Sequence, residues 1–373
     1  MTHRATLLLL LVFLLPAPVR ACSVPVFRYA LERWRVGDLY RIAVYRRDRL
    51  TADQERLVTL LRDLGDGKPM TANLAVETVE VAEPSLPWIE VRNPTDDATI
   101  WSGPLTLASV QLLIDSPARR ELARALMSGY SVVWLVVESG DRTLNAAAAL
   151  RVQRELNRLE RAIELPADDG DSASRLLSDV PLGVCFAVQR VARDDPREAA
   201  LLAMLLKSDP RLEQAKGPIF FPVFGRGRFL KGFPADALDA EEIGGVSRFL
   251  CSACSCMVKR IAPGTDLLTT ADWDAFTDNR DPIIFALSLL EPVSSDRSRM
   301  GKAGTPGWRL TFREEPETVP IPSGTKTAPT DRDTAPMQCC WIEAPCPVAG
   351  LAYLGVAGFA VAAAGFWLWR TWK

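Results

Sequence analysis

The strongest constraint on how this chain folds is a repeat in its sequence pattern. The same order of strand and helix signals occurs twice between residues 38 and 260. In each copy a strand leads into an amphipathic helix and a second strand, and after a crossover a proline opens a hairpin that a closing helix follows. The first strands are YRIAVY at 40–45, which alternates in polarity, and SVVWLVVES at 131–139, which is an almost unbroken apolar run. The repeat predicts an α/β protein in which mixed sheets are flanked by helices.

Helix start and stop signals support this order. Thr51 and Gln54 have the spacing of a capping box, and Asp239 stands where the N-cap of the closing helix is expected. The helical stretch 105–126 is interrupted by a Ser-Pro pair at 116–117, which predicts two shorter helices.

This order resembles the thioredoxin fold, and the resemblance covers roughly residues 38–260 as two copies. It implies cis peptide bonds before the prolines that open the third strands, Pro87 and Pro218. It also implies a CxxC motif between the first strand and the first helix, where the helix terminus activates a thiolate. This chain has Arg-Arg-Asp-Arg at 46–49 and Ser-Gly-Asp-Arg at 139–142 instead. The ordinary disulfide-exchange site is therefore not expected.

The N-terminal segment predicts export. Residues 1–21 contain an early arginine, an apolar run and small residues before Cys22, as in a secretory signal peptide. Cys22 is also a candidate for lipidation, although the long, charged Arg20 makes ordinary cleavage the favoured interpretation.

A second apolar segment lies near the C-terminus and predicts a single transmembrane helix. Residues 348–369 carry no charge and would span roughly 33 Å as a helix, which is enough to cross a bilayer. Basic residues and tryptophans follow at the end of the chain, so the tail at 370–373 is expected in the cytoplasm. The rest of the mature chain would then lie outside the cytoplasm, in the periplasm or its equivalent.

These signals divide the chain into segments. The first thioredoxin-like unit is assigned to 22–130 and the second, with a cysteine-rich helix end, to 131–292. A flexible juxtamembrane tether at 293–347, rich in proline, threonine, serine and glycine, separates them from the membrane helix.

Three further stretches resemble a bacterial family of exported, membrane-anchored proteins with no assigned activity: CSVPVFRYALERW from Cys22, SPARRELARALMSG from Ser116, and CSCMVK from Cys254. The excess of arginine over lysine, 36 to 8, also favours a bacterial source. We expect the apolar side chains of the first stretch to form one helix face that packs on the first unit.

Composition excludes several classes of function. The single histidine, His3, lies in the expected signal peptide, so the mature chain would have no imidazole for a Ser-His-Asp triad or a histidine metal site. The formal net charge is -2, which gives no basic surplus for binding nucleic acid.

The eight cysteines are the remaining source of chemistry. The densest group is Cys251, Cys254 and Cys256, which could form structural disulfides, bind Cu(I) or Zn(II), or act as a redox pair. Eight cysteines allow 105 pairings, so the sequence assigns none.

Two charged motifs have a structural and a functional interpretation. The Gly-Arg-Gly-Arg run at 225–228 suits a hairpin turn better than a phosphate cradle. The Asp-Trp-Asp run at 272–274 suits a helix start better than a pair of catalytic carboxylates.

The sequence thus predicts a non-catalytic binding or scaffold protein, held in the membrane by one helix, with an unidentified protein partner and no cofactor. The alternative is a protein that handles thiols or a soft metal, copper or zinc, at the three clustered cysteines.

Overall fold

The computed structural model describes residues 23–35, 37–67, 72–82, 87–253 and 264–280, which all belong to one compact unit. Several segments expected from the sequence lie outside the described residues, namely the signal peptide, Cys22, the tether, the membrane helix and the C-terminal tail. Among the described helices, none is both long and apolar enough to cross a membrane.

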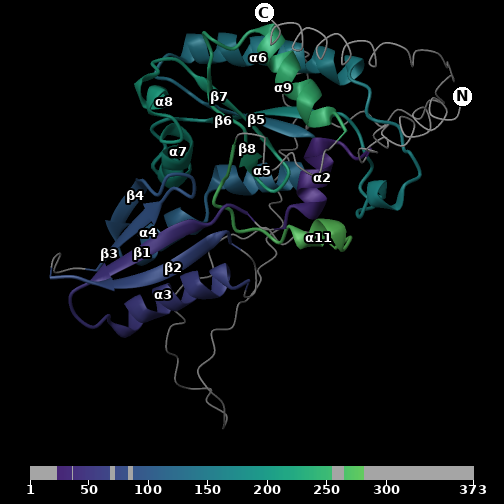
Figure 1. Cartoon of the computed structure of the whole chain (residues 1–373). Coiled ribbons are helices and arrows are strands. Elements are labelled where there is room, and N and C mark those ends of the chain that lie inside the picture. The colour runs from purple at the N-terminus through teal and green to yellow at the C-terminus, as the bar shows by residue number, and fades with distance from the viewer. Residues whose placement is uncertain (1–22, 36, 68–71, 83–86, 254–263, 281–373) are drawn as a thin grey trace, which may run out of the picture. The chain divides into compact units, whose positions relative to one another are not determined.

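The described chain is a mixed α/β protein with two mixed sheets flanked by helices (Figure 1). The elements up to the end of the first sequence repeat are α2 (Val26–Arg33), β1 (Tyr40–Arg46), α3 (Ala52–Gly65), β2 (Leu74–Glu80), β3 (Trp88–Arg92), β4 (Thr99–Pro104), α4 (Leu107–Ile114) and α5 (Pro117–Met127). The second repeat contains β5 (Val132–Val137), α6 (Arg142–Ala162), the 3-10 helix η1 (Ser172–Ser174), β6 (Phe186–Val191), the 3-10 helix η2 (Pro196–Glu198), α7 (Ala199–Leu206), α8 (Pro210–Gln214), β7 (Ile219–Phe224), β8 (Arg228–Phe229), β9 (Phe233–Pro234), α9 (Ala240–Cys251), β10 (Thr265–Asp266) and α11 (Asp274–Thr277).

The local signals in the sequence are confirmed at most of these boundaries. The Thr51 hydroxyl accepts a hydrogen bond from the backbone N–H of Gln54, whose side chain accepts from the Thr51 N–H, so the capping box of α3 is complete. Asp239 caps α9, and the Ser-Pro pair separates α4 from α5. The return strand expected after β7 is shorter than predicted, because β8 and β9, which each pair with β7, are only two residues long.

Both sheets have the same order of strands, with the parallel pair at one edge. In the four-stranded sheet the order is β2-β1-β3-β4, where β1 and β2 are parallel and β3 and β4 are antiparallel to their neighbours. In the six-stranded sheet the order is β10-β8-β7-β5-β6, with β9 also paired to β7, and only β5 and β6 are parallel. The repeat in the sequence therefore corresponds to a repeat in topology.

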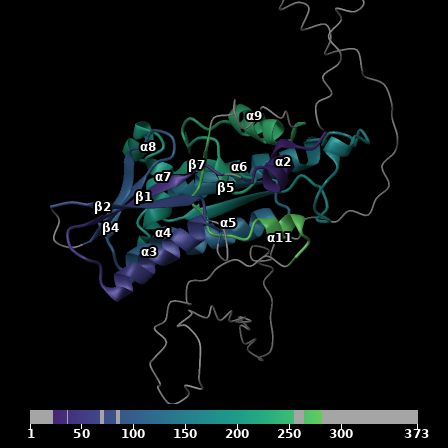
Figure 2. The ribbon, with the colours of Figure 1, turned by 60° about the horizontal axis from the view of Figure 1, so that its bottom comes forward.

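The second sheet is buried on both faces, which explains the apolar run of β5. One face packs against α6 and α9 through Val132, Trp134 and Val136. The alternate side chains, Val133, Leu135 and Val137, lie in the core cluster that also contains residues of α5 and α7. Figure 2 shows the ribbon from another side. The same core cluster includes Ile42 and Val44 of β1, so one hydrophobic core joins the two sheets.

The expectation that the N-terminal helix packs on the first unit is wrong. Helix α2 contacts β7, α9 and α11, and Val26, Phe27 and Ala30 lie in the core cluster of the second sheet. The Val26 N–H also donates to the Ser252 carbonyl at the end of α9 (3.0 Å). An amphipathic pattern identifies which face of a helix is buried, but not which element covers it.

Helix α2 also carries a buried ion pair. Arg28 Nε donates to Glu32 Oε1 at 2.7 Å, and their side chains are 1% and 0% exposed. Arg28 Nη2 donates to the carbonyls of Ser178 (3.1 Å) and Val180 (2.7 Å), while Glu32 accepts from the Leu177 N–H (3.0 Å). This network fixes the loop before β6 to α2.

The last described segment, residues 264–280, is termed the strap because it connects three parts of the fold. It pairs with β8 through β10, forms a bridge from Thr270 to Ala72 just before β2, and ends in α11 against α2. The strap therefore joins the second sheet to the first sheet and to the N-terminal helix.

Candidate functional site

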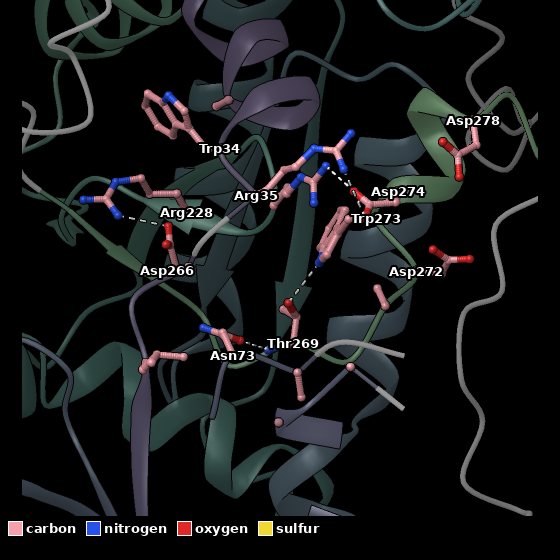
Figure 3. A pocket seen from close by; sticks show the side chains of 18 of the residues that line it. Trp34, Arg35, Asn73, Arg228, Asp266, Thr269, Asp272, Trp273, Asp274 and Asp278 are labelled. Carbon is pink, nitrogen blue, oxygen red and sulfur yellow. Dashed lines mark hydrogen bonds and ion pairs between the residues drawn. The ribbon is translucent and has the colours of Figure 1, made fainter. Parts of the chain in front are cut away.

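A cavity of about 650 Å³ opens where the strap passes α2, the start of β2 and the turn after β7. We call it the junction cavity. Figure 3 shows Trp34, the pair of Arg228 and Asp266, Asn73 with Thr269, and Trp273 around it. Its volume lies in the range of about 300–1,000 Å³ that small-ligand sites occupy.

One wall of the cavity is formed by Arg228 and by the two aspartates to which it is hydrogen-bonded, Asp38 and Asp266. Arg228 Nη1 donates to Asp38 Oδ2 and to Asp266 Oδ1, both at 2.9 Å, and its side chain is 6% exposed. The two aspartates also accept from each other's backbone N–H groups, at 2.8 Å and 3.2 Å. The Tyr40 hydroxyl donates to the Asp266 carbonyl (3.0 Å), and burial, followed by the charges of Asp266 and Asp38, raises the pKa of Tyr40. These bonds fix the wall, in which one guanidinium faces two carboxylates.

A chain of three hydrogen bonds forms the adjoining wall. Asn73 Nδ2 donates to the Asp38 carbonyl (2.9 Å), and Asn73 Oδ1 accepts from the Thr269 N–H (3.1 Å). The Thr269 hydroxyl in turn accepts from Trp273 Nε1 (3.3 Å). These bonds fix the indole ring of Trp273, which is 7% exposed, beside the cavity.

Two arginines at the cavity share one carboxylate. Arg226 Nη2 lies 2.8 Å from Asp274 Oδ1, and its Nε donates to the Leu31 carbonyl (2.8 Å). Arg35 Nη1 lies 3.7 Å from the other Asp274 oxygen, and its side chain is 59% exposed. Burial lowers the pKa of Arg226, an effect that Asp274 opposes. Arg35 is therefore the cation of this group that is held least tightly.

The Asp-Trp-Asp run provides a helix start, as predicted. Asp274 begins α11 and pairs with Arg226, whereas Asp272 Oδ2 pairs with Arg280 Nη1 at 2.9 Å. The two carboxylates thus have different arginine partners and do not form a pair that shares a proton, which is the arrangement that acid–base chemistry between them would use.

The Gly-Arg-Gly-Arg run forms the turn between β7 and β8, also as predicted. Gly225 has φ +58°, and a Cβ atom there would lie 2.6 Å from the Ala30 Cβ, so glycine allows α2 to approach the turn. Arg226 and Arg228 are engaged with carboxylates and carbonyls, which leaves the turn without a phosphate cradle.

The three clustered cysteines are only partly described. Cys251 is the last residue of α9, is 1% exposed, carries a free thiol and packs in the core of the second sheet. Burial raises the pKa of the Cys251 thiol to about 12. Cys254 and Cys256 lie outside the described residues. Among the residues that the structure describes, no group of His, Cys, Asp or Glu side chains is arranged to hold a metal ion.

Because only the thiolate attacks, we expect native Cys251 to resist alkylation at pH 8 and to react once the chain is unfolded. Quantitative mass spectrometry after iodoacetamide treatment, with and without urea, measures this at the peptide that contains Cys251. Labelling of Cys251 in the native protein as fast as in urea would contradict the buried position.

The positions at which the resemblance places CxxC are described and carry other groups. Residues 46–49 begin at the last residue of β1 and lead toward α3, and residues 139–142 follow β5 and end at the first residue of α6. Pro87 and Pro218 directly precede β3 and β7, where the sequence placed them. The carbonyl of each accepts an equivalent hydrogen bond, from the N–H groups of Leu105 and Ala235 (both 2.9 Å). The cis geometry of the two preceding peptide bonds stays a prediction.

Several residues of the junction cavity were missed by sequence reasoning. Asp38, Asn73 and Asp266 are isolated polar residues next to strands, and nothing local distinguishes them from other surface positions. Trp34 was interpreted only as part of a buried helix face. A usable signal was the tryptophan between two aspartates at 272–274, which marks a fixed aromatic group among charges.

Comparisons of the chain with protein families, with curated proteins and with solved structures found no match.

Proposed function

We propose that this chain is a non-catalytic binding protein of the bacterial cell membrane, with two thioredoxin-like units as its scaffold. In this proposal the helix at 348–369 anchors it, the units lie in the periplasm or its equivalent, and the C-terminal tail is cytoplasmic. The junction cavity is the ligand site.

The topology of the two sheets supports the thioredoxin-like part of the proposal. Each contains a parallel pair joined through a helix, followed by an antiparallel strand that a proline precedes and by a hairpin partner. This is the order of elements that the resemblance implies. The residues after β1 and β5 carry no thiol, which supports a role in binding rather than in disulfide exchange.

The observation that carries the ligand assignment is the loosely held Arg35 at the mouth of a cavity with fixed walls. Asp274 is already bound by Arg226 at 2.8 Å, so Arg35 can exchange its 3.7 Å contact for a ligand anion at little cost. Trp34 and Leu39 line the cavity beside it, and Leu39 is 51% exposed. The cavity therefore suits a small ligand with one anionic group and an apolar part.

Titration calorimetry on the detergent-solubilised full chain tests this assignment, with phenylacetate as the probe and neutral phenylacetamide as its matched control. We expect phenylacetate to bind with a Kd of about 1 mM or tighter, and Arg35→Gln to weaken binding roughly tenfold, since a hydrogen bond to a charged group contributes about 1.5–3 kcal/mol. Arg142→Gln, on the exposed start of α6, should have no effect.

Equal binding of phenylacetate and phenylacetamide, or an unchanged Kd in Arg35→Gln, would contradict the assignment. The thiol alternative is tested on the same preparation by reduction of insulin, which should stay at background. Turnover that Cys251→Ser, Cys254→Ser and Cys256→Ser abolish together, in a variant that stays folded, would favour that alternative.

A further inference from the structure

A second hollow lies between α9 and the chain that runs from β8 to β9. It has a volume of about 720 Å³ and shares no lining residue with the junction cavity. We call it the α9 groove; its lining includes Leu230, Lys231, Val246, Phe249 and the acidic first turn of α9.

The groove has an apolar floor. Leu230 and Val246 are partly buried and pack on the core cluster that contains Phe233. Phe249 lines the same groove but is 38% exposed, which makes it one of the few large apolar side chains that the described surface leaves open to solvent. Exposed apolar surface beside a hollow and next to charged groups is typical of an interaction site.

Gly245 keeps the middle of the groove open. It is an exposed residue inside α9, where glycine is less favourable than alanine. A Cβ atom at Gly245 would meet no atom of the described residues within 4 Å, so their packing does not require a glycine there. The neighbouring Gly244 differs, because its Cβ would lie 2.9 Å from Arg248 Nη1. The space above Gly245 is therefore room for another molecule.

The charges that line the groove indicate the charge of the molecule that would bind there. Asp239, Glu241 and Glu242 line it, against one ammonium group, that of Lys231, which lies 4.6 Å from the centre of the Phe233 ring. Asp239 accepts from the Glu242 N–H (2.9 Å), and within the described part of the chain none of the three carboxylates has an ion-pair partner. This surplus of negative charge repels anionic lipids and nucleic acids and attracts basic groups.

We propose that the α9 groove binds a basic segment of a partner protein, with an apolar side chain of that segment against Phe249 and Val246 and with its lysines or arginines at the acidic turn. Close approach of the segment's backbone over Gly245 accounts for the glycine. This inference rests on the proposed binding function and states which chemical groups its protein partner would carry. It does not depend on what occupies the junction cavity.

Fluorescence anisotropy of a short labelled peptide of leucine and lysine, titrated with the detergent-solubilised full chain, tests the proposal. We expect binding that weakens as salt is added. Gly245→Leu should weaken it at least tenfold, or about 1.4 kcal/mol. This variant should unfold at the same or a higher urea concentration than the wild type, because leucine favours helix over glycine and has open space there. Ala146→Leu, which adds the same side chain to an exposed position of α6, is the matched control and should bind normally.

Equal binding by Gly245→Leu and the wild type, or equal binding of a leucine and glutamate peptide, would overturn the proposal. Peptide binding that appears only after Lys259→Glu and Arg260→Glu would assign the groove to the chain's own basic stretch instead. Self-association of the wild type that Gly245→Leu abolishes, measured by light scattering, would assign it to a second copy. Each of these results leaves the phenylacetate experiment at the junction cavity unaffected.

Discussion

Replacing Glu32 with alanine should lower the free energy of unfolding by about 3–5 kcal/mol, because it leaves a buried guanidinium without its counter-charge. The Arg28 side chain is 1% exposed, and Glu32 is its ion-pair partner at 2.7 Å. Burial lowers the pKa of Arg28, and the charge and hydrogen bond of Glu32 oppose that effect. Loss of Glu32 removes the compensation while the cost of burial remains.

The effect should extend beyond the pair. Glu32 accepts from the backbone N–H groups of Leu177 (3.0 Å) and Ser178 (3.4 Å), so its loss also leaves donors of the loop before β6 without an acceptor. The Arg28 guanidinium lies 4.5 Å from the centre of the Phe276 ring on α11, which connects the same network to the strap. Alanine at position 32 therefore removes the ion pair with Arg28, weakens the contact of α2 with the loop before β6, and weakens its contact with the strap.

Urea unfolding of the full chain, followed by circular dichroism, measures the change. Glu155→Ala is the matched control: Glu155 pairs with Arg158 at 2.6 Å on α6, but the arginine is 57% exposed, and such pairs contribute about 0.3–0.5 kcal/mol. The double variant Arg28→Met, Glu32→Leu should recover part of the loss, since apolar replacement removes the uncompensated charge. A loss for Glu32→Ala no larger than for Glu155→Ala would contradict the argument.

Local structure in this chain follows from local sequence. The capping box at Thr51 and the Asp239 N-cap each settle a helix start within a few residues, so they can be identified without knowledge of the rest of the fold. The apolar run of β5 likewise predicts a strand covered on both faces, which the two core clusters confirm.

Local sequence does not determine which elements pack against one another. The hydrogen bond from the Asp38 N–H to Asp266 joins residues 228 positions apart, and the one from the Thr269 N–H to Asn73 spans 196 positions. Such pairs depend on the path of the strap, which has only one two-residue strand and one short helix to reveal it. Which of the two sheets α2 packs against likewise depends on tertiary contacts. Most of the candidate site could therefore not be predicted from the sequence, because its residues come together only through the tertiary contacts of the strap.

Replacing Arg228 with methionine should lower the free energy of unfolding by about 3 kcal/mol, because two carboxylates would face each other without the cation between them. Arg228 Nη1 lies 2.9 Å from both Asp38 and Asp266, whose side chains are 33% and 11% exposed. We expect less than the upper end of the range for buried pairs, since water can reach Asp38 and since Arg228 Nε is itself buried without an acceptor among the described residues.

Urea unfolding gives the stability, and phenylacetate titration of the same variant shows whether the wall of the junction cavity survives. Arg228→Lys keeps the charge but loses the fork that reaches both aspartates and the Gly264 carbonyl (2.6 Å), so its loss should be smaller. Asp266→Asn in the methionine variant removes one of the opposed charges and should restore part of the stability. If that second substitution lowers stability further, charge opposition is not the cause, and Arg228 acts mainly by closing the strap onto β8.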